Sequence, residues 1–215
     1  TREQQLHFAM EGWGTDEQAI HQALEGLSPV ERERLHGQAL QVLGRLADAH
    51  EAQGKYGPAL QTYQQSLSIS REIGDRKVEG ATLNNIGRVY YDQGDYEQAV
   101  QYFKQCLLPT KETGDKIGEG ATLNNIAAIY RAQGKYSKAI EYREQDLAIR
   151  RELGDRAGEA LSCWNIGTTY YDMGDLAQAE EHIALAVELA EQIGHPELER
   201  FRGGLERLRA KRQGA

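Results

Sequence analysis

Cysteine, proline and long apolar runs are scarce in this sequence. Its 215 residues include four prolines and two cysteines, Cys106 and Cys163, whose spacing fits neither a disulfide framework nor a zinc site. No apolar stretch approaches the roughly 20 residues that a membrane-spanning helix needs. A net charge of −8 disfavours binding to the phosphates of nucleic acids. These absences favour a cytoplasmic protein, and we expect no metal and no other cofactor.

Catalytic motifs are lacking too. The six histidines are scattered without the spacing of a metalloprotease motif, and no glycine-rich phosphate loop follows a strand pattern. We therefore expect that the chain is not an enzyme. It starts at Thr1 and shows no signal peptide, and we expect it to be a fragment of a longer protein.

Glycine, in contrast, is abundant and regularly spaced. Residues 80–90 and 120–130 are near copies, residues 160–170 follow in the same frame, and residues 40–50 keep the apolar positions, which gives a period of 40 residues. Two columns of this repeat hold only glycine: Gly54, Gly94, Gly134 and Gly174, and then Gly74, Gly114, Gly154 and Gly194. Because glycine adopts positive φ without steric cost, we predict that each of them ends a helix.

The apolar residues between these glycines have a helical period. Leu83, Ile86 and Tyr90 fall on one helix face, and Tyr96 and Phe103 fall on a face of the next helix. Each unit thus predicts two antiparallel helices of roughly 16 to 18 residues. Small residues allow the two helices to approach closely: Gly87, Ala127 and Gly167, opposite Ala59, Ala99, Ala139 and Ala179. Since one hairpin cannot bury its apolar face alone, the predicted fold is an all-α, right-handed α-solenoid of stacked hairpins.

The residues that recur are Leu83, Ile86, Gly87, Tyr90, Gly94, Tyr96, Ala99 and Phe103. This pattern resembles the tetratricopeptide repeat, in a 40-residue variety whose units are joined by Gly-Asp-Arg or Gly-Asp-Lys turns. The resemblance covers about residues 37–195 and implies four repeats, at 37–76, 77–116, 117–156 and 157–195. Residues 196–215 are then expected to form a capping helix and a basic tail, with Pro196 in the first helical turn.

Residues 1–36 do not follow the 40-residue frame. A capping box at Ser28 and Glu31, with Pro29 at the first helical position, predicts a helix over 29–53 that merges into the first repeat. An earlier helix is predicted at about 16–26.

The run from Ala9 to Glu17, followed by Ile20 and Leu24, resembles the opening half of an annexin repeat. In that family a glycine loop offers carbonyl oxygens to calcium, which the resemblance would place at Gly12 to Thr15. The acid that should complete such a site about 40 residues later is missing, because the matching stretch is Gln53-Gly54-Lys55. We therefore expect an annexin-like helical segment over 1–36. Calcium-dependent membrane attachment is kept as an alternative.

Asparagine recurs in the first helix of each unit, although its amide competes for backbone hydrogen bonds and makes it a poor residue for a helix interior. The resemblance to tetratricopeptide repeats implies that the first helices line a concave groove, where Asn85, Asn125 and Asn165 grip the backbone of a bound peptide. One amide offers a donor and an acceptor, as a peptide unit does. Neighbouring helical turns add cationic and aromatic side chains. The predicted groove residues are Arg45, Asn84, Asn85, Arg88, Tyr91, Asn124, Asn125, Arg131, Trp164, Asn165 and Tyr171.

The sequence thus predicts a scaffold that binds a peptide or protein segment, and it leaves alternatives open. The asparagines could instead tie neighbouring repeats together. The chain could also be the sensor or regulatory arm of a larger bacterial signalling or effector protein, packed against a sister domain. Self-association is a further alternative. The basic tail from Arg200 to Arg212 is interpreted as stabilising the end of its helix, rather than as a contact for lipid or nucleic acid.

Overall fold

The computed structural model describes residues 28–213, and all regular structure in this part of the chain is α-helical. The helices are α3 (Pro29–Ala52), α4 (Tyr56–Ile73), α5 (Arg76–Asp92), α6 (Tyr96–Glu112), α7 (Lys116–Ala132), α8 (Tyr136–Leu153), α9 (Arg156–Met173), α10 (Leu176–Ile193) and α11 (Leu198–Gln213). The fold is an all-α solenoid of helix hairpins, as predicted. No described helix is both long and apolar enough to cross a membrane.

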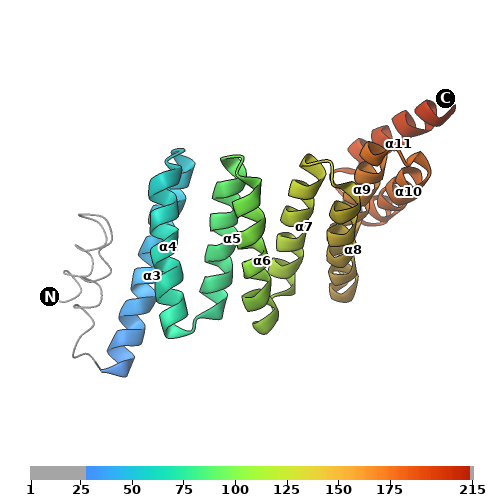
Figure 1. The fold of residues 1–215 in the computed structure, drawn as a ribbon. Coiled ribbons are helices and arrows are strands. Elements are labelled where there is room, and N and C mark those ends of the chain that lie inside the picture. Colours follow the sequence, from blue (N-terminus) through green and yellow to red (C-terminus); the bar gives the residue numbers. More distant parts are fainter. Residues whose placement is uncertain (1–27, 214–215) are drawn as a thin grey trace. The chain divides into compact units, whose positions relative to one another are not determined.

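The helices belong to two compact units, Thr1–Gly114 (unit 1) and Asp115–Ala215 (unit 2). Within unit 1, α3 packs on α4, α4 on α5, and α5 on α6 (Figure 1). Within unit 2, the same order runs from α7 through α8, α9 and α10 to α11. Every first helix of a hairpin (α3, α5, α7 and α9) is therefore followed by an antiparallel second helix (α4, α6, α8 and α10).

Glycines end the helices at the turns, and at some turns an aspartate then caps the next helix. The eight glycines predicted to end helices all have positive φ, between 64° and 92°, so this prediction is confirmed. Between a second helix and the next first helix, an aspartate follows the glycine and caps the new helix. Asp75 accepts a hydrogen bond from the Val78 backbone N–H at 3.0 Å, and Asp155 accepts one from Gly158 at 2.9 Å. The glycines thus end the helices, and the aspartates fix where α5, α7 and α9 begin.

The amino terminus of α3 has the predicted capping box. The Ser28 backbone N–H donates to the Glu31 carboxylate at 3.0 Å, and the Glu31 backbone N–H donates to the Ser28 hydroxyl at 3.4 Å. The earlier helix predicted at 16–26, the annexin-like run and the Gly12–Thr15 calcium loop lie outside the described residues.

First and second helices touch where the first helix has its smallest residues. A Cβ atom built on Gly87 would lie 2.7 Å from the Phe103 ring of α6. One built on Gly167 would lie 2.6 Å from a side-chain carbon of Ile183 and 3.0 Å from the backbone oxygen of Ala179 on α10. The α5–α6 and α9–α10 hairpins therefore close to a distance that excludes a methyl group, whereas α7 has Ala127 at the equivalent position.

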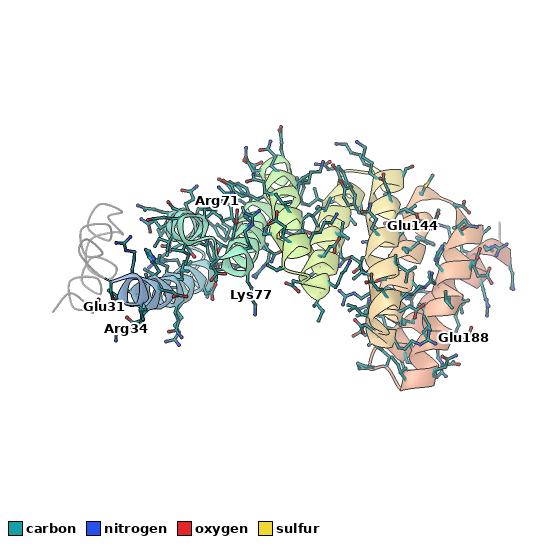
Figure 2. All side chains as sticks on the ribbon, turned by 90° about the horizontal axis from the view of Figure 1, so that it is seen from below. Glu31, Arg34, Arg71, Lys77, Glu144 and Glu188 are labelled. Atoms are coloured by element: carbon teal, nitrogen blue, oxygen red, sulfur yellow. The ribbon has the colours of Figure 1, made fainter. Side chains whose placement is uncertain are left out.

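A buried carboxylate ties the second helix α4 to the first helix α5 that follows it. Glu79 of α5 is 4 % exposed and accepts hydrogen bonds from Arg71 at 2.8 Å and Arg76 at 2.5 Å. Arg71, labelled in Figure 2, lies in the last turn of α4. Burial opposes ionisation of Glu79, but the two arginines outweigh it and the pKa of this carboxyl is lowered. Glu159 repeats the arrangement in unit 2 with Arg151 and Arg156.

The close approach in unit 2 predicts opposite effects for two chemically identical substitutions. Gly167→Ala should lower the free energy of unfolding by about 1–2 kcal/mol, because the backbone at Ala179 and Ile183 leaves no room for the methyl group. Gly44→Ala, in α3, should raise it by about 0.5–1 kcal/mol, because nothing lies within 4 Å and alanine is the better helix former. Urea unfolding measures both, and equal effects would contradict the packing described here.

Candidate functional site

The predicted ligand residues all lie on first helices. We call the surface of α3 and α5 that carries Arg45, Asn84, Asn85, Arg88 and Tyr91 the first-helix face of unit 1. The corresponding face of unit 2, on α7 and α9, carries Asn124, Asn125, Arg131, Trp164, Asn165 and Tyr171. None of these side chains is fully buried. Arg45 and Arg88 are exposed, Tyr91 and Tyr171 are each 39 % exposed, and the asparagines are half-buried.

The asparagines differ in their partners. Asn84 and Asn125 interact with other parts of the chain. Within residues 28–213, the side-chain amides of Asn85, Asn124 and Asn165 make no hydrogen bond. At Asn165 the backbone carbonyl, rather than the amide, is engaged, since it accepts from the hydroxyls of Thr168 and Thr169 at 3.0 and 2.8 Å. A half-buried amide without a protein partner is available to a ligand.

The two arginines predicted as cationic anchors form ion pairs between neighbouring first helices. Arg88 of α5 donates to Glu51 of α3 at 2.6 Å, and Arg131 of α7 donates to Asp172 of α9 at 2.6 Å. Exposed pairs of this kind contribute at most about 1 kcal/mol. The pairs instead change the charge of the first-helix faces, because a carboxylate neutralises each arginine. Sequence reasoning missed these partners, although both acids lie in the last turn of a first helix.

A tyrosine from a second helix supports the Glu51 pair. The Tyr63 hydroxyl of α4, on a ring that is 2 % exposed, donates to Asp48 at 2.6 Å and contacts Glu51 at 2.9 Å. Burial, together with these two carboxylates, raises the pKa of Tyr63 above its usual range. Tyr63 of α4 and Arg88 of α5 therefore both bind the acidic end of α3.

The aromatic residues predicted as anchors in unit 2 contact α11. Trp164 stacks on Phe201 with ring centroids 4.8 Å apart, and the Arg200 guanidinium lies 5.2 Å from the centroid of the Trp164 ring. The Lys211 ammonium lies 4.5 Å from the centroid of Tyr171. In unit 1, Tyr91 packs beside Tyr96, with centroids 5.6 Å apart. As α11 is placed, Trp164 and Tyr171 contact the chain's own carboxy-terminal helix.

Arg143 of α8 is a residue near the face that sequence reasoning missed. Its side chain is buried, at 4 % exposure, and its guanidinium donates to the Asn165 carbonyl and to the Thr169 hydroxyl of α9. The signal was present, because Arg143 occupies the repeat position that holds Tyr63, Phe103 and Ile183 in the other units. Burial lowers the pKa of Arg143 to about 10, and the Arg131 charge adds to this effect.

The described part of the chain shows no cluster of metal ligands, and its cysteine thiols are buried. Residues 28–213 contain no group of three or more histidine, cysteine or acidic side chains that could hold a metal ion. Both cysteines are buried, and burial raises the pKa of Cys163 to about 11, which disfavours the reactive thiolate. The Cys106 thiol donates to the Gly80 carbonyl at 3.2 Å.

The chain is a helical-repeat protein. It consists of stacked helix hairpins with left-handed glycine turns, and its first helices carry half-buried amides. The family model of the tetratricopeptide repeat matches residues 32–107 and 118–192, which is more than half of the chain. The chain therefore belongs to the tetratricopeptide repeat family. No curated protein matches its sequence.

Solved structures share the fold at low sequence identity. The apo form of RapI is 20 % identical with a TM-score of 0.77, and the match covers 91 % of this chain and 55 % of RapI. BtubC from P. vanneervenii is 17 % identical with a TM-score of 0.66, over 100 % of this chain and 93 % of BtubC. A signal transduction ATPase with numerous domains and a tetratricopeptide repeat sensor, from Pyrococcus horikoshii, is 20 % identical with a TM-score of 0.71, over 96 % and 32 %. This chain thus spans about half of RapI and about a third of the ATPase.

Arg143 is buried and no carboxylate contacts it, so we expect its charge to lower the free energy of unfolding. Arg143→Met keeps much of the volume and removes the buried charge, while the Thr169 hydroxyl still donates to the Asn165 carbonyl. We expect the free energy of unfolding to rise by about 1–2 kcal/mol, as measured by urea titration. Arg143→Ala is the control and should lower it, because it leaves a cavity. A loss of stability in Arg143→Met as large as that in Arg143→Ala would contradict this account.

Proposed function

We propose that this chain is a non-catalytic protein-interaction module whose first-helix faces bind an extended peptide or protein segment. The observation that carries the proposal is the pair of half-buried amides at Asn85 and Asn165, which have no hydrogen-bond partner within residues 28–213. Because both amides reach solvent, a ligand's peptide groups can take up their donors and acceptors in place of water.

The chemistry of the faces favours recognition of the ligand's backbone. A carboxamide can donate to a peptide carbonyl and accept from a peptide N–H at the same time, without contacting the ligand's side chains. Arg88 and Arg131 are already neutralised by Glu51 and Asp172, so they add little selectivity for acidic ligands. We therefore expect binding that depends weakly on peptide sequence and on salt.

A second candidate is that the chain is the sensor or regulatory arm of a larger protein. The likeness to an ATPase that carries a tetratricopeptide repeat sensor, of which the match covers 32 %, favours it. A sister domain would then cover the first-helix faces. Amide hydrogens of α5 and α9 would exchange more slowly in the larger protein than in this chain alone.

The groove proposal predicts loss of peptide binding without loss of fold. Peptides selected from a displayed library of random 12-residue sequences should bind the chain, and the triple variant Asn85→Ala, Asn125→Ala and Asn165→Ala should weaken their binding at least tenfold in a fluorescence titration. N-methylation of the peptide backbone should weaken binding similarly, because it removes the donors that the amides accept.

The matched control removes two exposed amides from second helices, Gln61→Ala in α4 and Gln101→Ala in α6, and should leave binding unchanged. Circular dichroism should give all variants the helicity and melting temperature of the unmodified chain. Unchanged binding in the triple variant would contradict the proposal. Unfolding of the triple variant would support the alternative that the asparagines tie neighbouring repeats together.

A further inference from the structure

The carboxy-terminal helix lies on a surface whose chemistry is complementary to its own. α11 packs on α10 and buries Phe201, Leu205 and Leu208 (Figure 1). Phe201 stacks on Trp164 of α9, so the helix contributes an aromatic ring to an aromatic surface. We call the surface beneath it the α11 seat, defined by Trp164, Tyr171, Glu180 and Glu191.

The remaining contacts between α11 and the seat each involve a cationic side chain of α11. Arg209 donates to Glu180 at 2.8 Å, and Arg212 donates to the same carboxylate. Arg202 pairs with Glu191 at 2.8 Å, and the Lys211 ammonium donates to the Tyr171 hydroxyl at 3.2 Å. All cations are on α11 and all anions are on α10. The seat therefore fits a basic amphipathic helix that also carries an aromatic residue.

Two features make this contact weak. The side chains of Arg202 and Arg209 are 44 % and 53 % exposed, so salt partly screens their ion pairs. Gly203 and Gly204 lie adjacent in the middle of α11, where glycine is a poor helix former.

The two glycines differ in what surrounds them. A Cβ atom on Gly204 would lie 2.3 Å from the Trp164 ring, so docking requires glycine there. A Cβ atom on Gly203 would have no neighbour closer than the Arg207 guanidinium at 3.4 Å. Docking thus does not require glycine at 203, and its presence weakens the helix without improving the contact.

We infer that α11 is a displaceable occupant of its seat, which exchanges with other basic amphipathic helices that carry an aromatic residue. In the closed state α11 packs on Trp164 and contacts Tyr171, and in the open state it leaves both to such a partner. The seat shares Trp164 and Tyr171 with the first-helix face of unit 2, but the exchange does not depend on the amides of Asn85 and Asn165, which carry the proposed peptide binding.

The test measures binding of a fluorescein-labelled peptide with the sequence of residues 197–213 to the full chain by anisotropy. Its apparent affinity is proportional to the fraction of chains with an open seat. Gly203→Ala should weaken binding about fivefold, because alanine favours the helix and so the closed state. Gly204→Ala should strengthen binding at least about fivefold, because the methyl group clashes with Trp164 and opens the seat. A peptide with the same composition in scrambled order should not bind.

Equal binding by Gly203→Ala and Gly204→Ala, or no binding by either variant and the unmodified chain, would overturn the inference. Circular dichroism checks that both variants are folded. Hydrogen exchange of the unmodified chain provides a measurement that does not depend on the variants. The α11 amides should exchange at least tenfold faster than those at the centres of α9 and α10. Equal protection of the three helices would also overturn the inference.

Discussion

Close contact between the first and second helix of each hairpin is the constraint on which the rest of the structure depends. Gly87 and Gly167 leave no space for a methyl group against α6 and α10. Left-handed glycines end each helix from α4 to α10 after 17 or 18 residues, so these helices have almost the same length. This regularity places the asparagines of successive first helices at equivalent positions, which is what a ligand read through its backbone requires.

Charge on the first-helix faces is balanced within the chain. Arg88 and Arg131, whose charges would otherwise attract an acidic ligand, each pair with a carboxylate of the adjacent first helix. These pairs add little stability, but they leave amides rather than charges as the polar groups with unfilled hydrogen-bonding capacity. In unit 2, Arg143 contacts the carbonyl of Asn165 from the buried side, so the candidate face and the α8–α9 interface are joined at one residue.

The sequence predicted the features that depend on residues close together in the chain. It did not predict the contacts that depend on which helices pack against each other. The glycine turns, the Ser28 capping box and the helix bounds follow from residues close together in the chain. The partners of Arg88 and Arg131 are 37 and 41 residues away, and the cover of Trp164 comes from Phe201, again 37 residues away. Such partners can be inferred only once the stacking of hairpins is known. Arg143 could have been found, because it alone breaks an otherwise aromatic or aliphatic column.

Amide recognition at the first-helix faces is the central claim, and the side-chain amide signals of asparagine report on it directly. In the ¹⁵N-labelled chain, the NH₂ resonances of Asn85 and Asn165 can be assigned by Asn→Ala variants and followed while a selected 12-residue peptide is added. The account predicts that both resonances shift with the same saturation curve as the bound peptide. Saturation by the peptide with both resonances unmoved would contradict it.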